Sequence, residues 1–298
     1  MVVCDRELKI SGRFVRIARL DGEKFRFVDD PKPILESLKQ SHARVDIFTF
    51  IQRLSDTKPR FTYPMEWDNL AAISVSSFEN WWTKQIGFKA RNKAKQAEKK
   101  GVVIREVPFS EGFVQGIWKI YNECPIRQGR RFPHYGKDFE TVYREAATYL
   151  DSSVFIGAFI EERLIGFVKL LVDENAVQAG LLNIVSLISE RDKAPTNALV
   201  AAAVKACARR SIPFLTYSNF SYGSKQRDTL SDFKERNAFQ RVEVPRYHVP
   251  LTMTGQAALR LGLHRRLSER VPESLAMRLR EVRESWYKRR FPNFNESA

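Results

Sequence analysis

One segment near the middle of the chain concentrates side chains that bind anions and stack on rings. It has neither the period of a helix nor the alternation of a strand, so we expect a loop. Arginine binds carboxylate or phosphate through paired N–H groups, tyrosine stacks on a sugar or base, and histidine titrates near neutral pH. The segment therefore predicts a substrate-binding site, with a solvated basic loop anchored by Phe132 as the alternative. Its candidate residues are Arg127, Arg130, Arg131 and Tyr135 for substrate binding and His134 for proton transfer.

Two neighbouring arginines of this segment cannot both face the same ligand. In an extended chain Arg130 and Arg131 point to opposite sides, so only one of them shares a side with Arg127. We therefore expect Arg127 and Arg130 to bind the anion together. A substrate-binding role also requires that the loop lie at the mouth of a binding cleft.

The overall charge agrees with an anionic partner. The 298 residues carry a formal net charge of +15, which favours nucleic acid, phosphate-bearing substrates or an acidic membrane surface, although many basic proteins are merely soluble. No apolar run approaches the roughly 20 residues that a membrane span needs, and the N-terminus does not resemble a signal peptide. The three cysteines are scattered and odd in number. We expect a reduced, cytoplasmic protein.

Other residues that could carry chemistry form weaker patterns. Two acids flank Trp67 in the segment 65–69, which is typical of a turn around a buried tryptophan, with a base beside a stacking platform as the alternative. We predict no metal site, because ligand spacing is lacking among the distant histidines His42, His248 and His264. Neither a Ser-His-Asp pattern nor a P-loop is present.

Strands alternate with helices along the chain, but a hairpin interrupts the alternation, so we predict an α/β fold with a mixed (α+β) sheet. We divide the chain into a strand region ending in a long basic helix (1–101), a second domain (102–252) and a basic helical tail (253–298). The expected elements are a hairpin at 13–28, a strand at 70–77, a helix at 78–100 ended by Gly101, a strand at 102–107, helices at 111–123 and 138–150, a hairpin at 154–173, a strand at 177–188, a helix at 197–210, a strand at 213–218, a helix at 229–239 and a strand at 241–251.

The order of elements from 102 to 250 resembles the Gcn5-related N-acetyltransferase (GNAT) fold. The segment "RNKAKQAEKKGVVIREV" is similar to the lysine-rich helix, led by arginine and ending in Lys-x-Gly-Val, of the FemABX aminoacyltransferases of peptidoglycan synthesis. Those proteins pair two GNAT-like folds in one chain. The resemblance covers about 78 to 250 and implies a partial first GNAT-like half at the N-terminus.

The resemblance implies where an acyl donor would bind. GNAT proteins hold the pyrophosphate of acyl-CoA at a helix N-terminus, through an Arg/Gln-x-x-Gly-x-Gly/Ala loop. The matching segment "RDKAPT" keeps the arginine but has alanine and threonine in the glycine places, and Pro195 removes one amide. FemABX proteins lack this loop and use aminoacyl-tRNA, so acetyl-CoA (or another acyl-CoA) and aminoacyl-tRNA are both candidate donors. A plain helix cap is the alternative for the implied donor-binding residues Arg191, Lys193, Ala194, Thr196 and Asn197.

The resemblance also implies a catalytic geometry. Two strands, here 183–188 and 213–218, should diverge at one end and leave backbone groups for the acyl donor. A tyrosine after the second strand often serves the family as general acid. Tyr217 and Tyr222 are the candidates, with a core position as the alternative for Tyr217.

We therefore expect an acyltransferase that acts on an amine of a polar, anionic acceptor, such as a cell-envelope or polysaccharide precursor. Aminoacyl-tRNA-dependent transfer by the same fold is the close alternative. A different class is a non-catalytic nucleic-acid-binding module that uses the basic helix and the rings of the loop. The tail "RLREVRESWYKRR" interleaves bases with apolar residues, so peripheral contact with the inner membrane surface is a third option.

Overall fold

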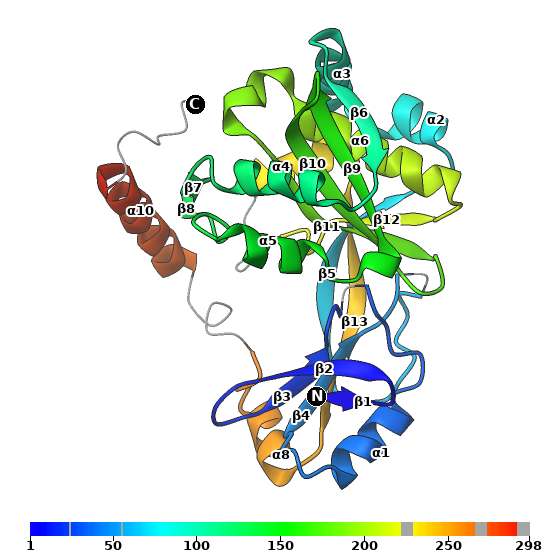
Figure 1. Ribbon diagram of the computed structural model, residues 1–298. Helices are drawn as coiled ribbons and strands as arrows, with labels where there is room; N and C mark the ends of the chain where they lie inside the picture. Colours follow the sequence, from blue (N-terminus) through cyan, green and yellow to red (C-terminus); the bar gives the residue numbers. More distant parts are fainter. Residues whose placement is uncertain (24, 55, 222–228, 266–272, 291–298) are drawn as a thin grey trace.

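The computed structural model describes residues 1–298 except 24, 55, 222–228, 266–272 and 291–298. Within these residues, a mixed sheet has the strand order β1-β2-β3-β4-β13-β5-β12-β11-β10-β9-β6 (Figure 1), which confirms the predicted α/β class. The strands are β1 (Val2–Val3), β2 (Arg6–Ser11), β3 (Ile17–Leu20), β4 (Ile47–Ile51), β5 (Met65–Ser74), β6 (Val103–Val107), β9 (Ser153–Ile160), β10 (Arg163–Val172), β11 (Gln178–Ser186), β12 (Phe214–Thr216) and β13 (Gln240–Pro250). A separate ribbon pairs β7 (Ile126–Arg127) with β8 (Arg130–Arg131).

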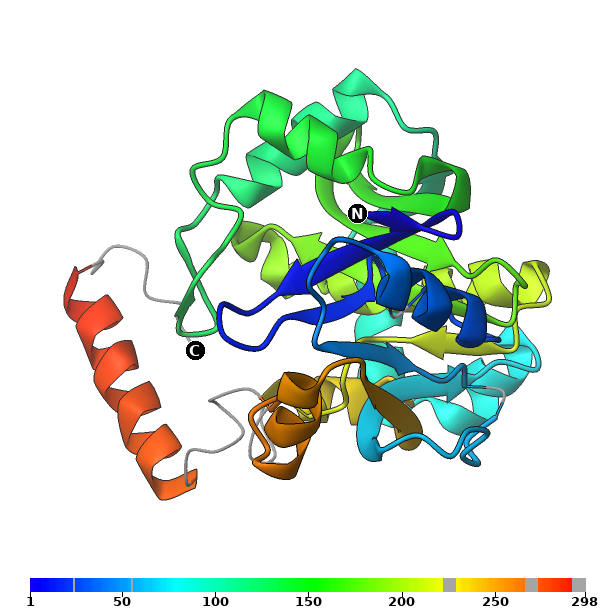
Figure 2. The ribbon, with the colours of Figure 1, turned by 90° about the horizontal axis from the view of Figure 1, so that it is seen from below.

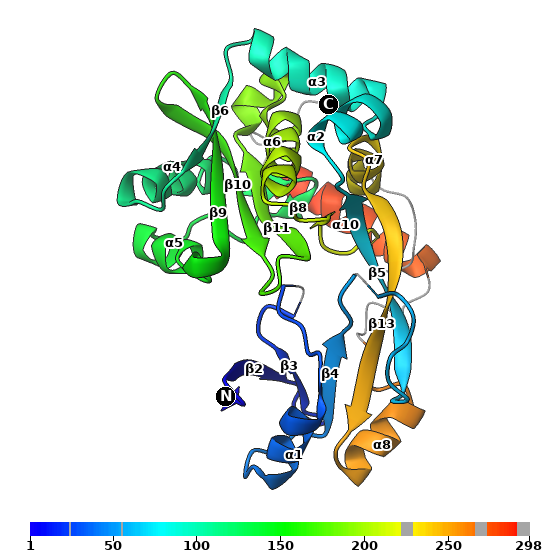
Figure 3. The ribbon, with the colours of Figure 1, turned by 90° about the vertical axis from the view of Figure 1, so that its right-hand side faces the viewer.

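Helices lie on both faces of the upper part of the sheet, which contains β6 and β9 to β12, as Figure 3 shows. The helices of the described residues are α1 (Lys32–Gln40), α2 (Phe78–Asn80), α3 (Phe88–Lys99), α4 (Glu111–Tyr121), α5 (Phe139–Ala146), α6 (Pro195–Arg209), α7 (Thr229–Arg236), α8 (Met253–Arg260) and α10 (Glu273–Arg290), with a π-helical turn at Trp81–Gln85 and 3-10 turns at Leu150–Ser152 and Ile188–Lys193. None of the helices in the described part of the chain is both long and apolar enough to cross a membrane.

Alternation along β9 and β10 gives the upper sheet two apolar faces. Ile156 and Val168 belong to the core formed with α6, whereas Phe155 and Phe167 belong to the core formed with α4. Because each strand contributes to both cores, the sheet is buried between α6 on one side and α4 with α5 on the other. The C-terminal end of β11 and the N-terminal end of α6 lie together at one edge of this layered arrangement.

The expected hairpin and the expected divergence of strands are both present. β9 and β10 pair antiparallel around an acidic turn. β11 pairs parallel with β12 only through Gln178–Gly180 and Phe214–Thr216, and then continues to Ser186 beside β10 alone. The half-buried stretch 182–186 therefore has an edge without β12.

β5 comes from the N-terminal region but completes the sheet of the later residues. It pairs antiparallel with β12 on one side and with β13 on the other (Figure 3). A buried ion-pair network ties these strands together: Arg246 on β13 contacts Glu23 at 2.8 Å and Asp68 of β5 at 2.9 Å. These ion pairs link the lower part of the sheet, which contains β1 to β4, to its upper part.

Three local expectations are wrong, each because tertiary contacts outweigh the local pattern. The N-terminal hairpin is formed by β2 and β3, earlier than 13–28, since the chain turns at Gly22 and buries Phe27 instead of pairing. The segment 65–69 begins β5, and Trp67 is exposed. The long helix breaks at Gly87, whose amide donates to Arg236 O and whose closeness to that oxygen leaves little room for a side chain.

Candidate functional site

The start of α6 lies against the end of β11. Thr196 Oγ1 is 2.9 Å from Ser186 Oγ, so the first turn of the helix sits beside the stretch that has left β12. Ala194 adopts φ +52°, the left-handed conformation that glycine favours, and it occupies the first glycine place of the family loop. No side chain caps this helix. The amides of the first turn therefore remain available to an anion, apart from the one that Pro195 lacks.

Charges around this helix start are largely compensated already. Lys193 Nζ is 2.5 Å from Glu190, and Arg163 binds the same carboxylate, so hydrogen bonds from both keep the pKa of Glu190 below its usual range. Arg191 is exposed and forms no ion pair within the described residues. The side-chain Nδ2 of Asn197 donates to Asn237 Oδ1 at 3.4 Å. The five expected donor residues are thus neighbours here, and their binding role stays a prediction.

The basic loop forms a two-residue ribbon whose register sets Arg127 directly opposite Arg130. Arg127 nevertheless turns into the protein: its Nη1 donates to Ser186 O at 2.7 Å and its Nη2 to Ile120 O at 3.0 Å. Arg130 and Arg131 are exposed. The loop therefore lies at the end of β11, and the planar fork of Arg127 is engaged internally; the role of the loop in binding an acceptor stays a prediction.

Glu123 is a positioning residue that the sequence analysis missed. Its carboxylate accepts from Arg127 Nη2 at 3.0 Å, from the Ile188 amide at 2.7 Å and from the Ser189 amide at 3.0 Å. It therefore joins the basic loop to the 3-10 turn that leads into α6. The acid–base spacing of four in the sequence was the available signal, although the structure places neither residue in a helix.

His134 is packed between rings. It stacks on Tyr121 with centroids 4.3 Å apart, and its Nδ1 is 3.5 Å from Glu145 Oε2. Burial, together with the charge of Lys137, lowers the pKa of His134, so the imidazole is neutral at pH 7 and can accept a proton. The Tyr135 ring is exposed.

The candidate acids differ in what the structure says of them. Tyr217 is half-buried, its ring centroid lies 5.8 Å from that of Phe239, and its amide donates to Ala71 O. Lys234 Nζ lies 4.9 Å from the same ring. Tyr222 lies outside the described residues. Tyr217 therefore stands just past the point where β11 and β12 separate, and its role as acid stays a prediction.

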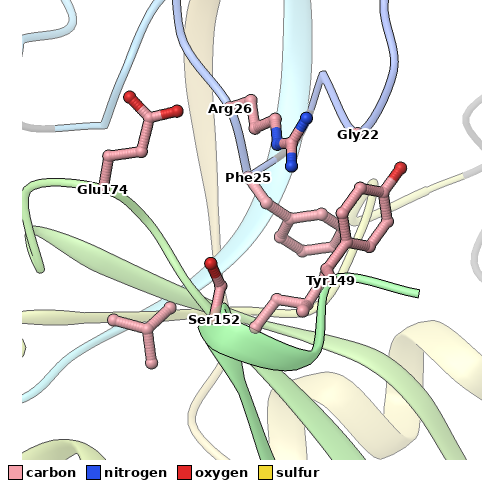
Figure 4. Close-up of a pocket in the computed structure, with 8 residues that line it drawn as sticks. Gly22, Phe25, Arg26, Tyr149, Ser152 and Glu174 are labelled. Atoms are coloured by element: carbon pink, nitrogen blue, oxygen red, sulfur yellow. The ribbon is translucent and has the colours of Figure 1, made fainter. Parts of the chain in front are cut away.

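A cavity of about 220 Å³ lies at the opposite end of β10 and β11 from the α6 start. Tyr149 and Arg26 form one wall, with the guanidinium 4.9 Å from the ring centroid (Figure 4). Sequence reasoning did not single out these residues. Because Val172 lines this cavity while Gly166, at the other end of β10, pairs with Ser186, the cavity is separate from the candidate donor site.

The expectation that the histidines are far apart is wrong for two of them. The ring centroids of His248 and His264 are 4.7 Å apart, and His264 Nε2 is 3.0 Å from Glu66 Oε1. The sequence could not reveal this, because the chain after α8 folds back onto β5 and β13.

Comparison with known proteins supports the fold. The chain matches the C-terminal domain of a putative lysylphosphatidylglycerol synthetase from Agrobacterium fabrum with a TM-score of 0.53 and 11% identity, over 85% of this chain and 83% of that one. It matches L-PGS from Bacillus licheniformis with a TM-score of 0.53 and 15% identity, over 87% and 86%. FemX gives a TM-score of 0.47 and 10% identity over 78% and 71%.

No protein-family model and no curated protein sequence matches the chain. At such low sequence identities, the matches with solved structures are evidence of a similar fold and of nothing further. Together with the strand order and the divergence of β11 from β12, they confirm the predicted GNAT-like fold.

Proposed function

We propose that this protein is an acyl-group transferase whose donor lies between β11 and β12 and whose acceptor is anionic. The observation that carries the proposal is the divergence of these strands beside the uncapped start of α6. Backbone groups along 182–185 that have no β12 partner can orient a carbonyl compound, and helix amides favour an anion nearby. His134 supplies a neutral base and Tyr217 an acid in this scheme.

Aminoacyl-tRNA is the donor that the chemistry favours over acyl-CoA. Pro195 removes one amide from the phosphate-binding turn, and Glu190 already neutralises Lys193. These features weaken a pyrophosphate site but leave the basic surface of α3, which suits a polynucleotide. The fold likeness to a putative lysylphosphatidylglycerol synthetase, whose name joins an amino acid to an anionic lipid, agrees with transfer of an aminoacyl group.

An anionic membrane surface is the acceptor environment that α10 supports. Leu279, Val282 and Trp286 recur at spacings of three and four and are all exposed, so one apolar stripe faces outward. Exposed arginines accompany it at 278, 283, 289 and 290. In Figures 1 and 2, α10 lies on the side of the molecule that also carries the β7–β8 ribbon. Exposed apolar side chains beside arginines can contact the apolar and anionic parts of a membrane surface together.

The test is a donor competition on the purified full chain. Acetyl-CoA and a mixture of aminoacyl-tRNAs are each offered, with anionic phospholipid vesicles and amine acceptors, and the products are identified by mass spectrometry. We expect transfer from aminoacyl-tRNA. Transfer from acetyl-CoA alone would assign the other donor, and nucleic-acid binding without any transfer would favour the non-catalytic alternative.

Charge reversal at the α6 start sharpens the test. Arg191→Glu should weaken donor binding about tenfold, because one charge-assisted contact is lost and a repulsion is added. Arg13→Glu changes the net charge equally at an exposed position far from α6 and is the matched control. Equal binding by the two variants would reduce the α6 start to a plain cap.

A further inference from the structure

Three residues from distant parts of the chain meet on one face of the lower part of the sheet, where β5 pairs with β13. The register sets Glu66 of β5 opposite Arg246 of β13, and His248 follows two residues later, so its side chain shares that face. His264, just after α8, approaches from outside the sheet. The potential ligand atoms of Glu66, His248 and His264 all lie within 4.8 Å of one another.

The histidines of this cluster carry polar atoms that the described residues do not satisfy. Both ring nitrogens of His248 and the Nδ1 of His264 are buried without a hydrogen-bond partner. Thr49, which the register sets opposite His248, has a buried hydroxyl in the same condition. His248 is 7% exposed and the His264 side chain 6%. Each such atom costs about 1–3 kcal/mol, so several at one spot call for a common partner.

One oxygen of the Glu66 carboxylate makes no hydrogen bond or ion pair within the described residues. Both known contacts of Glu66 use Oε1. Oε2 can therefore serve an ion while Arg265 stays in place.

We propose that Glu66, His248 and His264 bind one divalent transition-metal ion, zinc being the best fit. Two neutral imidazoles and a carboxylate are a common zinc donor set, with a fourth position left to water. Ligand bonds of about 2.0–2.2 Å hold ligand atoms roughly 3.3 Å apart, so side-chain rotations of about 1.5 Å close the widest gap. The ion would pin the segment after α8 onto β5 and β13, far from the α6 start.

The experiment uses the full chain after removal of metals with a chelator. Zn²⁺ is titrated in by calorimetry, and Co²⁺ is added separately to read the coordination from its visible absorption. We expect one ion per chain, a tetrahedral cobalt spectrum and a higher Tm with zinc. Binding below one equivalent, or an octahedral cobalt spectrum typical of loose surface sites, would overturn the proposal.

Variants locate the ion. His248→Ala, His264→Gln and Glu66→Gln should each weaken zinc binding at least tenfold, whereas His42→Ala, at an exposed position, should leave it unchanged. His264 lies outside the sheet, so His264→Gln is the variant expected to stay folded, and circular dichroism without zinc checks this. Full zinc affinity in folded His264→Gln would overturn the assignment. None of these readouts depends on transferase activity.

Discussion

Arg127 donates to Glu123 across 3.0 Å, and the same carboxylate accepts the amides of Ile188 and Ser189. The Glu123 carboxylate therefore holds the basic loop against the turn that leads into α6. Substitutions of Arg127 and Arg130 should separate this structural task from substrate binding.

We expect Arg127→Lys to lower the free energy of unfolding by about 1–3 kcal/mol, because an ammonium group cannot replace the fork that serves Glu123 and two carbonyls. Arg130→Lys keeps an exposed charge, so stability should not change while transfer to an anionic acceptor falls. Urea denaturation and initial rates measure the two effects. Equal stability of both variants would mean that the Arg127 contacts contribute nothing.

Ala194→Gly should stabilise the protein by up to about 1 kcal/mol, because relief of the left-handed strain of alanine at φ +52°, about 1–2 kcal/mol, exceeds the extra unfolded-state entropy of glycine, about 0.4–1 kcal/mol. Ala203→Gly, in the buried middle of the same helix, is the control and should destabilise by about 1 kcal/mol. Chemical denaturation of both variants gives the comparison. A destabilised Ala194→Gly would show that the alanine methyl group packs favourably.

Lowering the pH should destabilise the contacts that the Asp46 carboxylate makes with the Arg16 amide and Thr252. Burial alone would raise the pKa of this carboxyl, but hydrogen bonds from the Arg16 amide and Thr252, with the charge of Arg44, hold it below the ordinary 3.8. The folded pKa is depressed, so this stability is present above about pH 4 and is lost as the pH falls through the folded value. Asp46→Asn should be less stable at pH 7 and lose less between pH 5 and 2. Parallel pH profiles would contradict this account.

Val282→Glu should weaken binding to vesicles of anionic phospholipid roughly tenfold, since burial of one such side chain in the interface contributes about 1.5 kcal/mol or more. Phe14→Glu, at another exposed apolar position with the same change of charge, should have a much smaller effect. Cosedimentation with the vesicles measures both. An equal loss in the two variants would point to net charge rather than to the α10 stripe.

Elements with a strong local pattern were predictable. The 154–173 hairpin follows from two apolar runs around Glu161 and Glu162, and the start of α6 follows from its place in the resemblance. The direction of Arg127 was not, because it depends on Glu123 and on the end of β11, which only the fold brings together. The break at Gly87 likewise needs the backbone of Arg236.

The cluster of Glu66, His248 and His264 was hidden for another reason. Its members are separated in sequence by other elements, and no spacing rule applies to ligands from a strand, a second strand and a loop. Only strand register and the packing of α8 on β13 decide their proximity. Clusters of this kind can be recognised only when the tertiary structure is known.

The position of β5 between β12 and β13 constrains the order in which the chain can fold as it is synthesised. Both edges of this ten-residue strand emerge from the ribosome long before either partner exists. The nascent chain must therefore carry a strand with two open edges until nearly all of the sheet has been made, and such edges favour association with other chains. A chaperone that covers 65–74 during translation would raise the yield of native protein most during this interval.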